Sequence, residues 1–276
     1  MTDVGPYGPL LETRLRVLSW NLWWRFGPWE ARLPAITATI RDLAPDVCAL
    51  QEVWALEDGT SSASVIADAL GYDHVYASRF EMSEGVQFGN AVLSRWPIAS
   101  SEHWPLPVTR PDTEEMRTVV VAEIDGPRGP FQLWCTHLNW RFDHSDVRQE
   151  QVRYICERIA ERRPRSYPPI LCGDMNAPPD STEMWMLSGK TSIPVPKLVF
   201  HDAWEVAGEG DGHTWSNDNP YAALDLEVAR RIDYVYVGWP RRGGAGHVTS
   251  ARVIGRDAVA GVVPSDHYGV LAELRY

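Results

Sequence analysis

Apolar runs of strand length recur along this chain, and this pattern restricts the fold more than any other feature. Residues 46–53 (DVCALQEV) and 168–176 (PPILCGDMN) are almost continuously apolar up to their polar ends, as is typical of strands covered on both faces. Residues 125–130 (DGPRGP) separate two such runs and are typical of a hairpin loop. The predicted strands are residues 15–20, 46–53, 73–78, 90–95, 118–124, 131–138, 168–176, 231–238, 248–255 and 269–275.

Segments with apolar residues at helical spacing lie between these strands. The predicted helices are residues 33–43, 61–72 and 145–163. Gly71 is expected to end the second helix, and Ser145 is a candidate N-cap for the third. Residues 185–230 show neither pattern and are predicted to form irregular loops. Helices mixed with strands and hairpins predict an α/β (α+β) fold with two packed mixed β-sheets flanked by helices.

The length of 276 residues suits one large domain, and no linker-like segment divides the chain. We therefore expect a flexible lead at residues 1–13 and a single domain at residues 14–276. No apolar run is long enough to cross a membrane. The first residues lack the basic start and apolar block of a signal peptide, so a cytoplasmic protein is expected.

Charge and cysteine usage narrow the possible functions. The formal net charge of −11 excludes a uniformly basic nucleic-acid surface, although a local basic patch remains compatible with it. The cysteines are Cys48, Cys135, Cys156 and Cys172. None forms a Cys-x-x-Cys pair, which argues against a thiolate zinc site and favours buried free thiols, consistent with a reducing compartment.

Polar side chains with metal-binding or acid–base chemistry stand at the ends of the apolar runs. These residues are Asn21, Glu52, His137, Asn139, Asp174, Asn176, Asp233, Asp266 and His267. Layered α/β enzymes place their chemistry at strand ends and in the adjoining loops. The set contains oxygen ligands and imidazoles but no thiolate, which suits Mg²⁺ or Mn²⁺.

Each of these residues also has an ordinary structural explanation when taken alone. Asn21 and Asp174 could be turn residues, and Glu52 could be a solvated charge. His137 could be a hydrogen-bonded core histidine, and Asp233 could pair with a neighbouring arginine, Arg230 or Arg231. Their shared position at strand ends is what favours a common site.

The ordered series SWN, LQEVW, THLN, GDMNAPPDS, RIDYVYV and PSDH resembles the endonuclease/exonuclease/phosphatase superfamily. The resemblance covers about residues 14–276 and includes the pieces GNAVLSR, FHDAW and HTW. It implies a four-layer α/β sandwich whose catalytic site lies at one edge of the packed sheets. It also implies metal-dependent hydrolysis of phosphoester bonds.

The resemblance assigns roles residue by residue. Asn21, Glu52 and Asp266 match positions at or near the metal. His267 matches the essential histidine and Asp233 its carboxylate partner. Asp174 matches the carboxylate that orients or deprotonates the attacking water. Asn176 matches an amide that holds the phosphate, and His137 a second histidine found in several branches.

The sequence is compatible with more than one class of substrate. A phosphodiesterase of nuclease-like or phospholipase C-like type is favoured. A phosphomonoesterase on a nucleotide, sugar or inositol phosphate and a catalytically inactive binding module are the alternatives. Asn139 and Arg117 are predicted substrate contacts, and Arg117 could also be a surface charge. The tryptophans Trp23, Trp24 and Trp29 could stack on a base, enter a lipid interface or pack on the core. We expect a monomer.

Overall fold

The computed structural model describes residues 5–112, 116–163 and 165–276, and its strands form two six-stranded sheets. The strands of sheet A are β1 (Arg14–Asn21), β2 (Val47–Leu56), β3 (Asp73–Ser83), β4 (Val86–Ser94), β11 (Val248–Ile254) and β12 (Gly269–Arg275). They lie in the order β11–β12–β1–β2–β4–β3. The strands of sheet B are β5 (Ile98–Pro105), β6 (Thr118–Gly126), β7 (Gly129–His137), β8 (Ile170–Asp174), β9 (Phe200–Asp202) and β10 (Asp233–Gly238). Their order is β5–β6–β7–β8–β10–β9.

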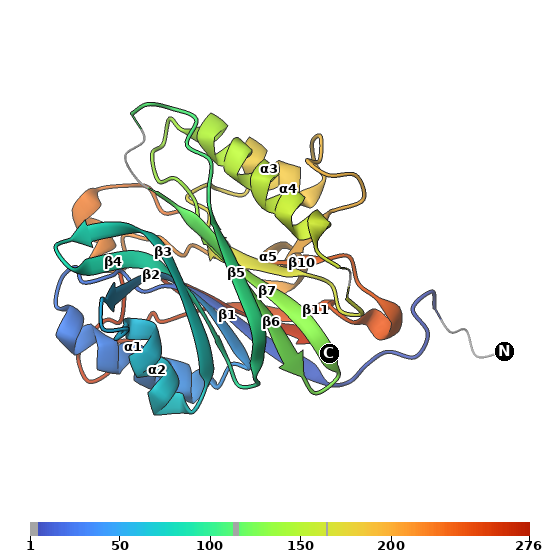
Figure 1. The fold of residues 1–276 in the computed structure, drawn as a ribbon, viewed down its shortest axis with the longest axis horizontal. Helices are drawn as coiled ribbons and strands as arrows, with labels where there is room; N and C mark the ends of the chain where they lie inside the picture. Colours follow the sequence, from blue (N-terminus) through green and yellow to red (C-terminus); the bar gives the residue numbers. More distant parts are fainter. Residues whose placement is uncertain (1–4, 113–115, 164) are drawn as a thin grey trace.

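Helices cover the outer faces of both sheets. α1 (Trp29–Leu43) and α2 (Ser62–Leu70) cover sheet A, and α3 (Ser145–Glu161) and α4 (Thr182–Ser188) cover sheet B. The short α5 (Ala203–Ala207) instead packs against β10 and β11 and contributes to the core between the sheets. The 3₁₀ turns are η1 (Ala222–Asp225) and η2 (Arg242–Gly244). Figure 1 shows α1 and α2 on one side of the strands and α3 and α4 on the other. The predicted α/β sandwich with two mixed sheets flanked by helices is therefore confirmed.

Three apolar clusters correspond to the contacts between these layers. Between the sheets, Val17 and Ala49 of sheet A share a buried cluster with Leu133 and Val235 of sheet B. A second cluster joins Ile36 of α1 and Ile66 of α2 to the outer face of sheet A. The third joins Val152 of α3 and Leu187 of α4 to the outer face of sheet B. Burial of these faces is the main favourable term for a fold of this kind.

Two parallel strand pairs bring polar side chains together at the sheet edges. β1 pairs with β2, and β7 with β8, in parallel, and the other pairings of the sheets are antiparallel. Because parallel strands end at the same sheet edge, Asn21 reaches the edge beside Gln51, and His137 reaches it beside Asp174.

Some boundaries differ from the sequence-based predictions. β2 does not end at Val53, as predicted, but continues to Leu56, with an irregularity between Leu50 and Val53, where Glu52 adopts a φ of 52°. This bulge turns the Glu52 carboxylate toward the sheet edge while pairing with β4 resumes beyond it. Ser145 is not an N-cap, because His144 occupies the cap position and the Ser145 hydroxyl donates to the Glu183 carboxylate at 2.8 Å.

Other differences concern elements that the pattern missed. β5 was not predicted, because its sequence IASSEHWP is largely polar and exposed, as befits an edge strand. The region at residues 185–230, predicted to be irregular, contains the end of α4 and all of β9, α5 and η1. The four cysteines are free and buried, as predicted.

The N-terminal segment is only partly described, since residues 1–4 lie outside the described ranges. Within the described part, Leu11 donates its amide to the Gly243 carbonyl, and Tyr276 donates its amide to the Thr13 carbonyl. The single domain at residues 14–276 stays a prediction. No helix among the described residues has the length and apolarity needed to cross a membrane.

Candidate active site

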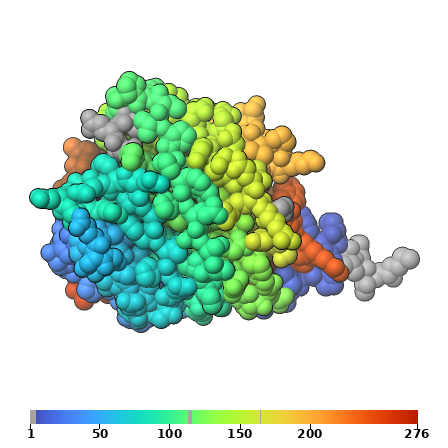
Figure 2. Space-filling view, viewed as in Figure 1, coloured from blue at the N-terminus to red at the C-terminus, as the bar shows by residue number. Residues whose placement is uncertain are grey.

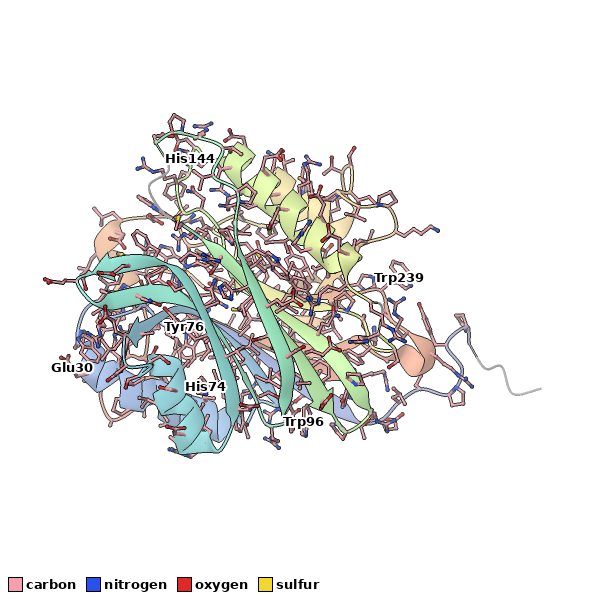
Figure 3. The ribbon with its side chains drawn as sticks, viewed as in Figure 1. Glu30, His74, Tyr76, Trp96, His144 and Trp239 are labelled. Carbon is pink, nitrogen blue, oxygen red and sulfur yellow. The ribbon has the colours of Figure 1, made fainter. Side chains whose placement is uncertain are left out.

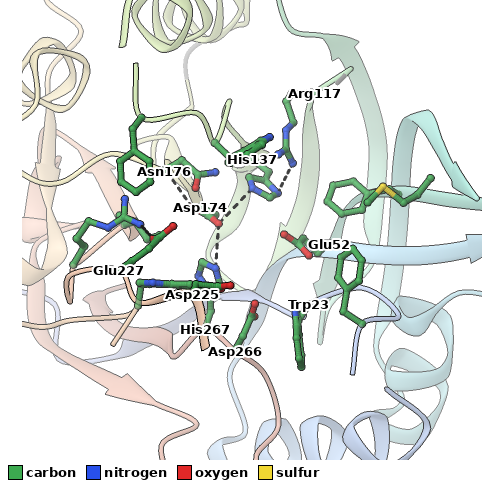
Figure 4. A pocket seen from close by; sticks show the side chains of 18 of the residues that line it. Trp23, Glu52, Arg117, His137, Asp174, Asn176, Asp225, Glu227, Asp266 and His267 are labelled. Carbon is green, nitrogen blue, oxygen red and sulfur yellow. Dashed lines mark hydrogen bonds and ion pairs between the residues drawn. The ribbon is translucent and has the colours of Figure 1, made fainter. Parts of the chain in front are cut away.

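A cavity of about 570 Å³ opens at the edge where β1, β7 and β8 end (Figure 4). Its floor carries most of the polar residues that the sequence placed at strand ends. Those that line it are Glu52, Arg117, His137, Asp174, Asn176, Asp266 and His267. Asn21 and Asp233 lie immediately behind these side chains and hydrogen-bond to them.

The imidazole of His267 is paired with Asp233. Its Nδ1 lies 2.9 Å from Asp233 Oδ2, and both side chains are buried. The alternative partners of Asp233 are excluded, because Arg230 pairs with Glu227 and Arg231 with Asp202. Thr214 Oγ1 accepts the Asp233 amide, which fixes the start of β10.

The charge state of His267 follows from its surroundings. Burial alone lowers the pKa of His267, but the carboxylates of Asp233, Asp174 and Asp266 outweigh burial and hold the pKa well above its ordinary value. The ring is therefore an imidazolium at neutral pH. Its Nε2 faces Asp174 Oδ2 at 3.7 Å.

Asp174 stands at the centre of the floor (Figure 4). Its Oδ2 accepts a hydrogen bond from Asn21 Nδ2 at 3.0 Å and lies 3.4 Å from His137 Nε2. Its Oδ1 accepts the Asn176 amide at 2.9 Å. Burial, reinforced by the nearby Asp233 carboxylate, raises the pKa of Asp174 to about 6. A carboxylate held in this way and with this pKa is suited to accept a proton near neutral pH.

Glu52 and Asp266 form the acidic side of the floor. Burial raises the pKa of Glu52, and burial together with the Glu52 charge raises the pKa of Asp266 to about 7. Asn21 Nδ2 donates to Glu52 Oε1 at 3.1 Å, whereas Glu52 Oε2 is buried with no hydrogen-bond partner among the described residues. A buried carboxylate oxygen without a partner is costly, and a bound cation would remove that cost. These residues therefore fit a hard divalent ion.

A second group of potential ligands lies next to this acidic pair. One ligand atom each from Asp174, Asp233 and His267 lies within 4.8 Å of the others. This group is already joined by the Asp233–His267 hydrogen bond, and its histidine is positively charged. For that reason Glu52 and Asp266 are the better place for a cation.

His137 differs from His267 in its charge state. Its Nδ1 lies 2.9 Å from Arg117 Nη1, and a guanidinium can only donate, so Nδ1 accepts and the proton resides on Nε2. Burial and the positive charge of Arg117 keep the pKa of His137 well below its ordinary value. Arg117 is itself buried, which rules out a surface charge.

The two asparagines near the floor are placed differently. Asn176 lines the cavity with a φ of 49°, and its Nδ2 donates to the Leu138 carbonyl at 3.1 Å. Asn139 is buried, and its Oδ1 accepts the Arg141 amide at 3.1 Å, which caps the turn after β7. The cavity lining does not include Asn139.

Aromatic and sulfur-containing side chains form the walls. Trp23, Phe80 and Phe142 are among the lining residues. Phe88 lies beside His137, with ring centroids 6.0 Å apart, and Trp215 lies beside His267, with ring centroids 4.9 Å apart. The tryptophans after β1 lie in two different environments. Trp23 lines the cavity and contacts Tyr221, with ring centroids 4.7 Å apart, whereas Trp24 and Trp29 pack in a cluster around Trp54.

Arg32 is a residue that the sequence pattern did not single out. It is buried, and its guanidinium donates to backbone carbonyls of Leu22, Trp23, Trp24, Phe26 and Pro264. These carbonyls belong to the loop after Asn21 and to the segment before Asp266, so Arg32 ties the two acidic-side segments together. A lone arginine on an amphipathic helix gives no sequence signal of this role.

Arg148 does the same for the opposite loop. It forms a buried ion pair with Glu183 at 2.6 Å and donates to the carbonyls of Asn139 and Arg141. The loops on both sides of the cavity are thus each fixed by one buried arginine from the helix that follows.

Comparison with known proteins agrees with this geometry. Residues 18–267 match the model of the Endonuclease/Exonuclease/phosphatase family. The protein YbhP of Escherichia coli (strain K12) is 30% identical over 175 residues, covering 58% of this chain and 66% of YbhP. The inositol phosphosphingolipids phospholipase C of Schizosaccharomyces pombe is 27% identical over 257 residues, covering 80% of this chain and 59% of that enzyme.

A solved structure extends the comparison to the fold. The crystal structure of D. rerio TDP2 complexed with single strand DNA product has a TM-score of 0.77 at 19% identity, covering 96% of this chain and 100% of that one. The matches to the two curated relatives span about two thirds or less of those proteins' own length. Since the family model matches nearly the whole chain, the chain belongs to the endonuclease/exonuclease/phosphatase family.

Proposed function

We propose that this protein is a hydrolase of phosphodiester bonds that depends on Mg²⁺ or Mn²⁺. The observation that carries the proposal is the line of Asp233, His267 and Asp174 next to the partnerless Glu52 oxygen. In this proposal the charged His267 ring stabilises the phosphate, Asp174 accepts a proton and Glu52 binds the metal ion, all at the cavity floor. Phosphoester hydrolysis needs these three functions.

The proposed roles follow from charge and hydrogen bonding. Asp174, with a pKa of about 6, orients the attacking water and takes its proton. The His267 imidazolium donates from Nε2 to a phosphoryl oxygen, and Asp233 holds the ring by accepting from Nδ1. His137 donates from Nε2 toward Asp174 and keeps that carboxylate in place.

The metal ligands in this proposal are Glu52 and Asp266, with Asn21 fixing the Glu52 carboxylate. When bound, a divalent ion neutralises charge on the phosphoryl oxygens. Because the unpaired Glu52 oxygen and the Asp266 carboxylate are both buried, they favour binding of a cation over remaining empty.

The apolar walls favour a diester over a small monoester. Phe88 lies beside His137 and Trp215 beside His267, so a phosphate held between these histidines has apolar surface next to it for its substituents. The phospholipase C and the DNA-bound TDP2 among the similar proteins are named for phosphodiester chemistry or shown with a DNA product, which supports the same choice.

One assay tests the proposal against its alternatives. Hydrolysis of bis-(p-nitrophenyl) phosphate is compared with hydrolysis of p-nitrophenyl phosphate, each with Mg²⁺, with Mn²⁺ and with EDTA. We expect metal-dependent activity that favours the diester, and Asp174→Asn should abolish it. The matched control is Asp68→Asn on α2, an exposed position away from the cavity. Preference for the monoester would support the phosphomonoesterase alternative, and no hydrolysis of either compound would support the inactive binding module.

The proposal includes a monomeric enzyme of the cytoplasm. Light scattering after size exclusion tests the oligomeric state directly, with a mass of 31.1 kDa expected.

A further inference from the structure

Acidic and apolar side chains alternate in the segment that begins at the end of η1. In the sequence Leu224–Val228 (LDLEV), the acidic residues Asp225 and Glu227 line the cavity. The apolar residues that alternate with them face solvent: Leu224 is 79% exposed, Leu226 is 88% exposed and Val228 is 72% exposed. A surface loop that only met water would gain by the opposite arrangement, since burial of apolar area is favourable.

These side chains belong to a larger apolar rim around the mouth of the cavity. We define the rim as Phe26, Met82, Phe142, Leu224, Leu226 and Val228, all of them exposed large hydrophobic residues. Phe26, Met82 and Phe142 also line the cavity, so the rim is continuous with the site. In Figure 2 the orange residues near 220–230 lie at the left edge of the molecule beside the teal β3–β4 hairpin that carries Met82.

The rim rests on anchored backbone. Arg32 fixes the loop that carries Phe26, and Arg148 fixes the loop that leads to Phe142. Asn219 ties η1 to the floor: its Nδ2 donates to the Ser265 carbonyl at 2.8 Å, and its Oδ1 accepts the Tyr221 amide. Exposed apolar side chains on fixed loops mark a docking surface more strongly than the same side chains on a loose tail.

The charged side chains of the cavity lining indicate which class of partner the apolar rim can dock on. The cavity lining contains five carboxylates, Glu52, Asp174, Asp225, Glu227 and Asp266, but two arginines, Arg117 and Arg230. Arg230 is paired with Glu227, and Arg117 contacts His137. The whole chain carries −11. A nucleic-acid strand needs a basic track for its successive phosphates, and the described residues of the lining form none.

We propose that the apolar rim docks on a lipid bilayer of zero net charge and that the substrate is a zwitterionic phospholipid. This inference rests on the proposed phosphodiesterase function. The rim side chains enter the interface, as apolar and aromatic side chains of peripheral enzymes do. The lipid phosphate reaches the floor, and the ammonium group of the headgroup lies against the carboxylate of Asp225 at the cavity mouth, since that of Glu227 is paired with Arg230.

The reaction on such a lipid balances without a further reactant. The water oxygen attacks phosphorus and gives its proton to Asp174. The bond between phosphorus and the lipid alcohol oxygen breaks, and that oxygen takes up a proton from water, while Asp174 returns its proton to solvent. The products are the free lipid alcohol, which stays in the bilayer, and the headgroup phosphomonoester, which enters water.

The experiment uses the full chain and sedimentation with large unilamellar vesicles. The vesicles contain phosphatidylcholine with sphingomyelin, and a second set contains added anionic phosphatidylserine. The rim variant combines Leu224→Ser, Leu226→Ser and Val228→Ser. The matched control combines Leu10→Ser, Val206→Ser and Trp239→Ser, which are exposed apolar residues elsewhere; Figure 3 shows Trp239 at the opposite end of the molecule from the rim. Released phosphocholine and bis-(p-nitrophenyl) phosphate hydrolysis are measured in parallel.

We expect the wild type and the control variant to bind zwitterionic vesicles and release phosphocholine. The rim variant should lose about tenfold or more in vesicle partition, because three inserted side chains are removed. It should hydrolyse the soluble diester at the wild-type rate. Phosphatidylserine should weaken binding, because the protein is acidic.

Several outcomes overturn the inference. They are a wild type that stays in the supernatant, equal binding by the rim variant, or no phosphocholine release by an enzyme that hydrolyses the soluble diester. Loss of single-stranded oligonucleotide binding or of a dimer in the rim variant would assign the rim to nucleic acid or to a second copy instead. A protein that binds vesicles but hydrolyses no diester at all would instead contradict the proposed function, since partition is measured independently of turnover.

Discussion

Replacing Arg32 by lysine tests how the acidic side of the site is held. The guanidinium donates five hydrogen bonds to backbone carbonyls, whereas an ammonium has three donors on a flexible stem. At least two of these five carbonyls therefore lose their donor, and three of the five bonds are buried. Each such loss costs about 1–3 kcal/mol, so we expect a decrease of about 3 kcal/mol in the free energy of unfolding. For a chain of this size that corresponds to a melting temperature lower by about 6 °C.

Urea unfolding of the metal-free protein, followed by tryptophan fluorescence, measures this change. Arg41→Lys is the control, because Arg41 lies on the same helix but is exposed. Arg32→Lys should also require more Mg²⁺ for half-maximal turnover, since the loops beside Asn21 and Asp266 lose their common anchor. If the two lysine variants unfold at the same urea concentration, the carbonyls are satisfied in another way and the reasoning is refuted.

Four further predictions concern the floor of the site and the fold. His267→Ala should lower kcat by about 10²–10⁴; Asp233→Asn should also slow turnover, and the double variant should be little worse than His267→Ala alone, whereas multiplying losses would separate the two residues. Glu52→Gln should raise the Mg²⁺ concentration needed for half-maximal rate, and superimposable metal titrations would remove Glu52 from the metal site. Since the pKa of Asp266 is raised to about 7, protons compete with the metal. Calorimetry in the metal-free state should therefore show that metal binding releases protons and weakens as the pH falls below about 7; an affinity that is flat between pH 6 and 8 would contradict this. Thermal unfolding should give one calorimetric transition, because the sheets share one core; two independent transitions with stable proteolytic fragments would argue against a single domain.

The sequence predicted the strands that are buried on both faces and the polar residues at their ends. This prediction succeeded because an apolar run such as residues 168–171 is typical of a strand that is covered on both faces of its sheet. The parallel pairing of β7 with β8 then brought His137 beside Asp174. The family motifs added the partnership of Asp233 with His267, which lie 34 positions apart and meet only in the folded chain.

Other features could not be predicted, for definite physical reasons. The bulge at Glu52 depends on how β2 pairs with β4, which the sequence of β2 alone does not specify. The role of Arg32 depends on five carbonyls from two distant segments. β5 is stabilised by its pairing with β6 at a sheet edge rather than by an apolar face of its own, so its polar sequence gave no strand signal.

The pairing of β1 with β12 has a consequence for how the protein is made. Arg14 lies opposite Arg275, so β1, an inner strand of sheet A, gains one of its two neighbours only after residues 269–275 have been made. Closing a loop of this length carries a large entropic cost, and contacts so distant in sequence slow folding. His267, two residues before β12, enters the site only in that late step. During synthesis on the ribosome, sheet B can form before β1 pairs with β12, and catalytic competence should appear only once β12 has left the ribosome.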